Sequence, residues 1–161
     1  MYIKAAAIGA VWLLVADSAA ASVSNTRQSC IREAMDAGSA ALGNPNRLST
    51  LYERYFEGER IAQLAAGRDW KRYSEIQRNA QRNRVKRFVV GVLAPSFSEY
   101  KGSEVEFLSE SDSKVKGAVT DSQGQRRTVT WYFTGECKFV NLSIDGYGSL
   151  ISFVGKEPAR N

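Results

Sequence analysis

The sequence contains no histidine, only three prolines and only two cysteines among its 161 residues. Histidine is the usual general base near neutral pH and a common metal ligand, so its absence removes the residue on which most acid–base and metal sites depend. The chain also lacks a glycine-rich phosphate loop, a Gly-x-Ser-x-Gly turn and a Cys-x-x-Cys pair. We therefore expect no catalytic site, no metal and no cofactor.

No apolar run is long enough to span a membrane. Lys4 precedes an apolar run from Ala5 to Ala16, and the small residues that end at Ala21 follow it. This order is typical of a cleavable secretory signal peptide, whereas a membrane-spanning helix needs about twenty apolar residues. We predict a signal peptide at 1–21 and one exported domain at 22–161; a retained membrane anchor is the alternative.

The formal net charge is +5, from 22 Lys and Arg against 17 Asp and Glu. Several of the cations lie close together at 78–87, on a predicted helix. A solvated helix face is the simpler interpretation. The alternative is a docking face, with Arg78, Arg82 and Lys86 meeting lipid phosphates or an acidic partner protein. Nucleic acid is not an expected partner of an exported protein.

Cys30 and Cys137 form one even pair in the predicted mature chain. Outside the reducing cytosol such a pair is more often bridged than free. The alternative is two separate buried thiols, because sequence alone does not bring two Cα atoms within bonding reach.

The hydrophobic period changes from helical to alternating near residue 103. Helices are predicted at 24–42, 45–56 and 61–66, and a fourth runs from a capping box at Ser74–Gln77 to Pro95. The predicted buried face of the fourth helix consists of Ile76, Ala80, Val85, Phe88, Val89, Val92 and Leu93. Strands are predicted near 105–107, 115–119, 128–134 and 138–144, with a polar loop at 109–113 and a two-residue hairpin at Gly135-Glu136. The expected fold class is α+β, with helices covering one face of a four-stranded antiparallel meander.

Large aromatic side chains are the most informative feature of the strand-rich half. Trp131 and Phe133 alternate with polar residues and point to one face of their strand. Such residues usually fill a core, but against a curved sheet they can also line a hydrophobic pocket. A small enzyme that uses Tyr132 and Asp145 is a further alternative, which nothing in the spacing favours.

From about Leu51 to Leu150 the chain resembles the MlaC family, the periplasmic phospholipid-carrying auxiliary component of the Mla (toluene-tolerance type) ABC transport system. The resemblance rests on five segments in the same order and spacing. They are Phe56-Glu57-Gly58-Glu59-Arg60-Ile61-Ala62, Gly67-Arg68-Asp69-Trp70-Lys71, the capping box, Tyr100-Lys101-Gly102 before Val105-Glu106-Phe107, and Lys138 to Gly146.

The resemblance implies an NTF2-like fold, a periplasmic location and a non-enzymatic carrier that holds phospholipid acyl chains in an apolar cavity. It also implies exchange with Mla-type complexes of the inner and outer membranes. By position, the implied pocket residues are Phe88, Val92, Phe97, Tyr100, Phe107, Val129, Trp131, Phe133 and Leu142.

Two departures from the family pattern affect these expectations. Gly155-Lys156-Glu157-Pro158 stands where the family continues with a long helix, so the pocket is expected to be shallower, open to a partner or absent. Cys137 replaces the usual aromatic start of the last strand. A pocketless interaction module of the cell envelope is therefore the alternative function.

Overall fold

The computed structural model describes residues 18–96, 100, 102–121 and 123–156. Phe97 and nearly all of the predicted signal peptide lie outside these residues. The helical elements are α1 (Ser18–Ala40), α2 (Pro45–Tyr55), α3 (Gly58–Ala66), η1 (Gly67–Arg72), α4 (Glu75–Phe88), η2 (Val89–Leu93), α5 (Ala94–Ser96), η3 (Gly102–Glu104) and α6 (Leu150–Lys156). The strands are β1 (Glu106–Ser111), β2 (Lys114–Thr120), β3 (Arg126–Phe133), β4 (Phe139–Ile144) and β5 (Gly148–Ser149).

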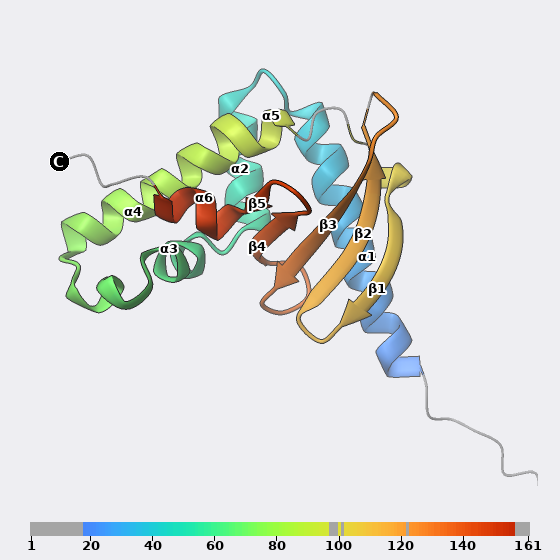
Figure 1. Cartoon of the computed structure of the whole chain (residues 1–161), viewed down its shortest axis with the longest axis horizontal. Coiled ribbons are helices and arrows are strands. Elements are labelled where there is room, and N and C mark those ends of the chain that lie inside the picture. Colours follow the sequence, from blue (N-terminus) through green and yellow to red (C-terminus); the bar gives the residue numbers. More distant parts are fainter. Residues whose placement is uncertain (1–17, 97–99, 101, 122, 157–161) are drawn as a thin grey trace, which may run out of the picture.

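The strands form one antiparallel sheet in the order β1-β2-β3-β4-β5. Figure 1 shows α1 running along one face of the sheet, with the remaining helices gathered beside β4. The α+β class and the meander are confirmed, although β5 makes the sheet five-stranded rather than four-stranded. A strand of two residues is too short for an alternating pattern to reveal it.

Two predicted connections in the sheet were wrong. β1 continues to Ser111, so most of the predicted polar loop at 109–113 is strand. This strand lies at the edge of the sheet, where polar residues are exposed and the alternation is weak. The β3–β4 connection spans residues 134–138, closed by the Thr134 amide donating to the Lys138 carbonyl at 2.9 Å, instead of a two-residue turn.

Two of the four predicted helix starts, those of α2 and α4, are confirmed by their hydrogen bonds. The other two helices begin earlier than predicted, α1 at Ser18 instead of residue 24 and α3 at Gly58 instead of residue 61. Asn44 Oδ1 accepts from the Arg47 amide at 3.1 Å, and Pro45 follows in the first helical position of α2. At α4, Ser74 Oγ accepts from the Gln77 amide while Gln77 Oε1 accepts from the Ser74 amide. Each bond satisfies an amide that the first helical turn leaves without a partner.

The sequence predicted one regular helix that ends at Pro95, but α4 ends at Phe88 and the helical turns continue as η2 and α5 to Ser96. The π-helical turn η2 follows α4, and the Ala94 amide donates to the Val89 carbonyl. A proline in a regular helix clashes with the carbonyl four residues earlier, and a wider π turn accommodates it. Ser96 Oγ donates to the Val92 carbonyl at 2.7 Å and so satisfies a backbone group next to the irregularity.

The buried face of α4 also differs from the predicted one. Gln81 and Val85 face the interior, whereas Ile76 is 81% exposed. Gln81, Val85 and Val89 follow one another at spacings of four residues, which places them on a single helix face. Ile76 lies nine residues before Val85, half a turn out of phase with that face.

The C-terminal segment forms a short helix that the sequence did not predict, α6 from Leu150 to Lys156, which ends within the expected break at Gly155 to Pro158. Leu150 and Val154 are both only 2% exposed. A Cβ on Gly155 would lie 3.1 Å from the Ala65 carbonyl oxygen, so the missing side chain lets α6 approach α3 closely. A helix of seven residues therefore stands where the sequence predicted none.

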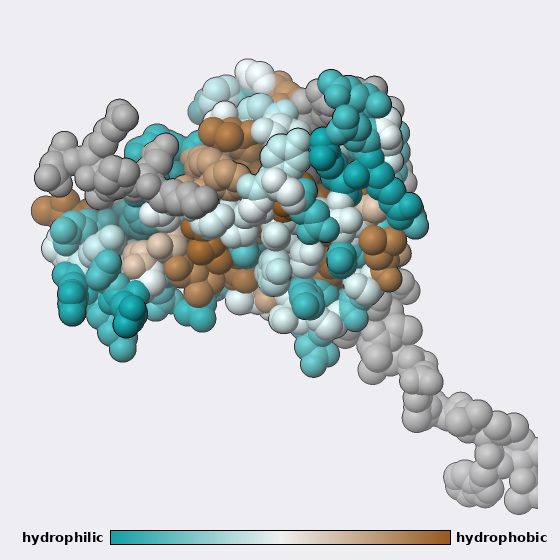
Figure 2. All heavy atoms as spheres, in the orientation of Figure 1, coloured by the Kyte–Doolittle hydropathy of each residue, from teal (hydrophilic) through white to brown (hydrophobic). Residues whose placement is uncertain are grey.

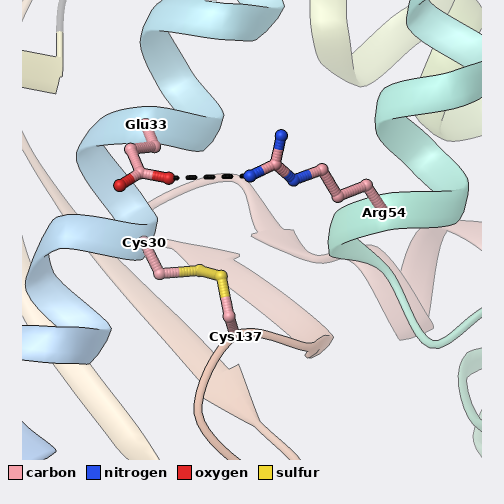
Figure 3. Close-up of a disulfide and its surroundings, with 4 residues drawn as sticks. All are labelled: Cys30, Glu33, Arg54 and Cys137. Carbon is pink, nitrogen blue, oxygen red and sulfur yellow. Dashed lines mark ion pairs between the residues drawn. A yellow bond between two sulfur atoms is a disulfide. The ribbon is translucent and has the colours of Figure 1, made fainter.

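Cys30 and Cys137 form a disulfide, with their Cα atoms 5.7 Å apart. Figure 3 shows it linking α1 to the β3–β4 connection, with Glu33 of α1 facing Arg54 of α2 nearby. The carboxylate and the guanidinium of that pair are 3.9 Å apart. The expected bridge is thus confirmed, and it fixes the middle of α1 to the sheet.

The core consists of two clusters of buried side chains. The first lies between the sheet and α1 and includes Ile31, Val115 and Trp131. The second lies among α2, α3, α4 and α6 and includes Ile61, Val85 and Leu150. Phe56 and Leu93 pack against both clusters. The space between the clusters is where the cavities lie.

Candidate functional site

Two apolar cavities lie between the core clusters. The larger one has a volume of about 390 Å³ and lies among the sheet, the segment from Phe88 to Ser96 and α6. Small-molecule pockets typically occupy about 300–1,000 Å³. The residues that line it are Phe88, Val92, Leu93, Ser96, Tyr100, Val119, Asp121, Arg127, Val129, Leu142, Ile144, Tyr147, Gly148, Leu150 and Phe153. This volume is large enough for part of an apolar ligand.

A smaller cavity of about 90 Å³ lies between α1, α2, η2 and the sheet. Its walls include Ile31, Met35, Tyr52 and Trp131. Leu93 and Leu142 line both cavities. The two spaces therefore adjoin at these leucines, and a change in either side chain alters both.

Alternation along the strands supplies the apolar floor of the larger cavity. Val119 of β2 and Val129 of β3 face inward, and Leu142 and Ile144 of β4 continue this face. Side chains two residues apart point to the same side of a sheet. The irregular η2 turn, carrying Val92 and Leu93, forms the opposite wall.

Exposure separates the bottom of the larger cavity from its mouth. Val129 and Leu150 are 1% and 2% exposed, whereas Val92, Tyr147 and Phe153 are 51%, 58% and 40% exposed. Figure 2 shows apolar residues near the middle of the visible face, with hydrophilic residues around them. Large apolar side chains exposed beside an apolar cavity are typical of a ligand entrance.

Two charged residues lie at one end of this apolar lining. Arg127 Nε is 3.8 Å from Asp121 Oδ2, and the Arg127 guanidinium lies 5.1 Å from the centre of the Tyr147 ring. The Asp121 and Arg127 side chains are 13% and 30% exposed. The larger cavity is therefore amphipathic, with an apolar interior and a polar edge.

Tyr52 contributes a polar group to the smaller cavity. Burial, reinforced by the negative charge of Glu53, raises the pKa of Tyr52 to about 12. The phenol therefore stays neutral at any physiological pH, and the smaller cavity gains no charge from it.

The structure brings together six of the nine predicted pocket residues. Phe88, Val92, Tyr100, Val129 and Leu142 line the larger cavity, and Trp131 with Leu142 lines the smaller one. Phe107 and Phe133 line neither. The Arg32 guanidinium lies 4.8 Å from the centre of the Phe107 ring. Phe133 is buried, and the centre of its ring lies 5.1 Å from that of Phe139. Phe97 lies outside the described residues.

The cations of the predicted docking face have partners within the chain. Arg82 pairs with Glu59 and Glu75, and Lys86 Nζ lies 2.9 Å from Glu53 Oε1. The Arg78 guanidinium lies 5.4 Å from the centre of the Trp70 ring. These contacts reduce the excess positive charge of the face, and docking there stays a prediction.

The residues of the enzyme alternative are not placed for joint chemistry. Tyr132 occupies an alternate position to Trp131 on β3, so its side chain leaves the sheet on the other face. Asp145 is exposed, and neither residue lines either cavity. Within the described part of the chain, no group of three or more His, Cys, Asp or Glu could hold a metal ion.

Sequence reasoning missed Arg127, Asp121 and the α6 wall of the larger cavity. A signal for the first two was present, because Arg127 precedes Val129 and Trp131 in the same alternation and Asp121 follows Val119 by two residues. The short α6 gave no comparable signal.

In the described ranges, no helix combines the length and apolarity that crossing a membrane requires.

The fold is similar to a solved structure of a phospholipid-binding protein from Ralstonia solanacearum, determined in complex with a phospholipid. The TM-score is 0.58 at 18% sequence identity, covering 80% of this chain and 83% of that one. No curated protein sequence matches the chain. The family model described as MlaC protein matches residues 28–155, and the chain therefore belongs to the MlaC family.

Proposed function

We propose that this protein is a periplasmic carrier that holds phospholipid acyl chains in the larger cavity and moves them between membranes without covalent chemistry. The observation that carries the proposal is the apolar cavity of about 390 Å³ with apolar side chains exposed at its mouth. Membership of the MlaC family and the phospholipid complex of the structural neighbour support it.

The physical basis is reversible burial. Each methylene that leaves water for an apolar site gains about 0.8 kcal/mol, so a few buried carbons of each chain give a substantial affinity. The exposed mouth lets chains enter and leave without unfolding the domain. On this proposal the predicted signal peptide exports the protein, and Mla-type complexes of the two membranes deliver and accept the lipid.

Native mass spectrometry tests cargo binding. The protein, expressed with its own N-terminal segment, is purified from the periplasm without detergent, and its native mass is compared with its denatured mass. We expect a phospholipid at one molecule per chain. A lipid-free mass that persists after incubation with phosphatidylethanolamine vesicles would contradict the proposal.

A pair of matched variants locates the site. Val92→Glu places a carboxylate at the cavity mouth, whereas Ile76→Glu makes the same change at an exposed α4 position that lines neither cavity. Bound lipid should fall at least tenfold in Val92→Glu and stay unchanged in Ile76→Glu, because a charge next to acyl chains has to be desolvated. Transfer of labelled lipid between donor and acceptor vesicles then measures the carrier step.

A further inference from the structure

At one end of the sheet a charged residue continues the inward-facing row of each of two neighbouring strands, on β3 itself and in the residue directly after β2. On β3 the inward positions alternate along the strand, and Arg127 occupies the first of them, before Val129, Trp131 and Phe133. On the neighbouring strand, Asp121 follows Val119, and the register pairs Val119 with Arg127. One cation and one anion therefore meet where the apolar floor of the larger cavity ends.

The contacts around Arg127 orient its guanidinium. Nε faces Asp121 at 3.8 Å, Nη2 donates to Gln125 Oε1, and the Tyr147 ring lies 5.1 Å away. Asp121 is occupied by its own turn, since its Oδ1 accepts from the Gln123 amide at 3.0 Å and the Gln125 amide at 2.7 Å. Arg127 Nη1 has no hydrogen-bond partner among the described residues, so the guanidinium retains donors for a ligand.

We propose that Arg127, held by Asp121, Gln125 and Tyr147, binds the phosphodiester of a phospholipid headgroup while the acyl chains occupy the larger cavity. This inference rests on the proposed function. A planar guanidinium matches the oxygens of a phosphate and stays charged at every physiological pH. The polar end of the cavity then selects phospholipids over uncharged lipids that have the same chains.

The neighbouring arginine supplies a matched control. Arg126 points to the opposite face of β3, is 57% exposed and lies 2.8 Å from Glu106. Arg127→Gln and Arg126→Gln remove the same charge from adjacent positions, so an effect of net charge alone appears equally in both variants.

The assay measures lipid selectivity rather than total binding. Each protein is incubated with phosphatidylethanolamine vesicles that contain diacylglycerol with chains of a different mass, and the bound lipids are counted by native mass spectrometry. The ratio of bound phospholipid to diacylglycerol, corrected for the vesicle composition, should fall about tenfold in Arg127→Gln, the usual scale of a hydrogen bond to a charged group. Arg126→Gln should keep the original ratio.

A second variant tests the same site if Arg127→Gln does not fold. Tyr147→Leu keeps both charges and an apolar mouth but removes the ring beside the guanidinium, and it should lower the ratio about threefold. A ratio that is unchanged in both variants overturns the inference. Equal loss of both lipids in Arg127→Gln also overturns it, because the arginine would then only support the fold.

The unaltered protein separates this inference from the proposed function. Binding of both lipids without preference would keep the carrier proposal and overturn the headgroup site, whereas binding of neither lipid would overturn both. Calorimetric titration with inorganic phosphate should show no binding, because the single guanidinium is shared with a carboxylate. Saturable phosphate binding that Arg127→Gln abolishes would identify free phosphate as the ligand and overturn the headgroup assignment.

Discussion

Reduction of the Cys30–Cys137 disulfide should destabilise the fold strongly without abolishing it. The bridge joins residues 107 positions apart, and both sulfur atoms remain in place after reduction. In the chain-entropy model, closing a loop of this size stabilises a protein by up to about 4.7 kcal/mol. With a urea m-value of about 2 kcal/mol per molar, the unfolding midpoint should fall by roughly 2 M.

Other contacts explain why the reduced protein should still fold. Gln28 Nε2 donates to Glu110 Oε2 at 3.2 Å, and Asp36 Oδ1 accepts from the Gly102 amide at 2.7 Å, so α1 is tied to the strand-rich half on both sides of Cys30. Ile31 is fully buried next to the bridge. These contacts keep the same native structure while the unfolded chain gains freedom.

The assay is urea unfolding followed by circular dichroism, with and without reductant. The double variant Cys30→Ala/Cys137→Ala is the control, since reductant should not change its midpoint. A midpoint shift below about 0.5 M in the unaltered protein would refute the chain-entropy reasoning, because it corresponds to only about 1 kcal/mol. Two titratable thiols in the unreduced, denatured protein would refute the bridge itself.

Two further predictions concern packing and titration. Gly102→Ala should lower the free energy of unfolding by about 1–3 kcal/mol, because the new Cβ would lie 2.3 Å from the Arg32 carbonyl oxygen. A Cβ at Gly38 meets nothing within 4 Å, so Gly38→Ala should stabilise α1 by about 0.5–1 kcal/mol. Thermal unfolding compares the two variants, and equal midpoints would contradict the close approach at Gly102. The pKa of Tyr52 is raised from 10.0 to about 12, so the folded state favours the neutral phenol. The contribution of this phenol to the stability of the fold is complete below pH 10 and is lost as the pH rises to about 12. Urea midpoints across that range should therefore fall less steeply in Tyr52→Phe, and parallel curves would show that another group governs the alkaline transition.

Local signals predicted the parts of the fold that depend on nearby residues. The Asn44-Pro45 start of α2 and the capping box at Ser74 are satisfied within one helical turn, so sequence alone specifies them. The alternation of Val129, Trp131 and Phe133 likewise gives the inward face of β3. Such patterns need no knowledge of the rest of the chain.

The predictions that failed depended on contacts with distant segments. Ile76 belongs to an apolar pattern on its own helix, yet α3 and α6 pack against a different face, which Val85 occupies. A proline usually ends a regular helix, but η2 accommodates Pro95 and the helical turns continue to Ser96. Phe107 and Phe133 resemble pocket residues in sequence and pack elsewhere, because an alternating aromatic pattern does not show where a core leaves space.

By itself, the sequence determined the α+β class, the order of the four longer helices and the four longer strands, the inward rows of the sheet and the absence of histidine chemistry. Tertiary structure alone decided that Cys30 meets Cys137, that two core clusters leave a cavity between them, and that Arg127 and Asp121 meet at its edge. The physical reason is the distance along the chain between the residues that form each feature. Caps and alternation are satisfied by neighbours along the chain, whereas a bridge, a cavity and a charge pair depend on how distant segments pack.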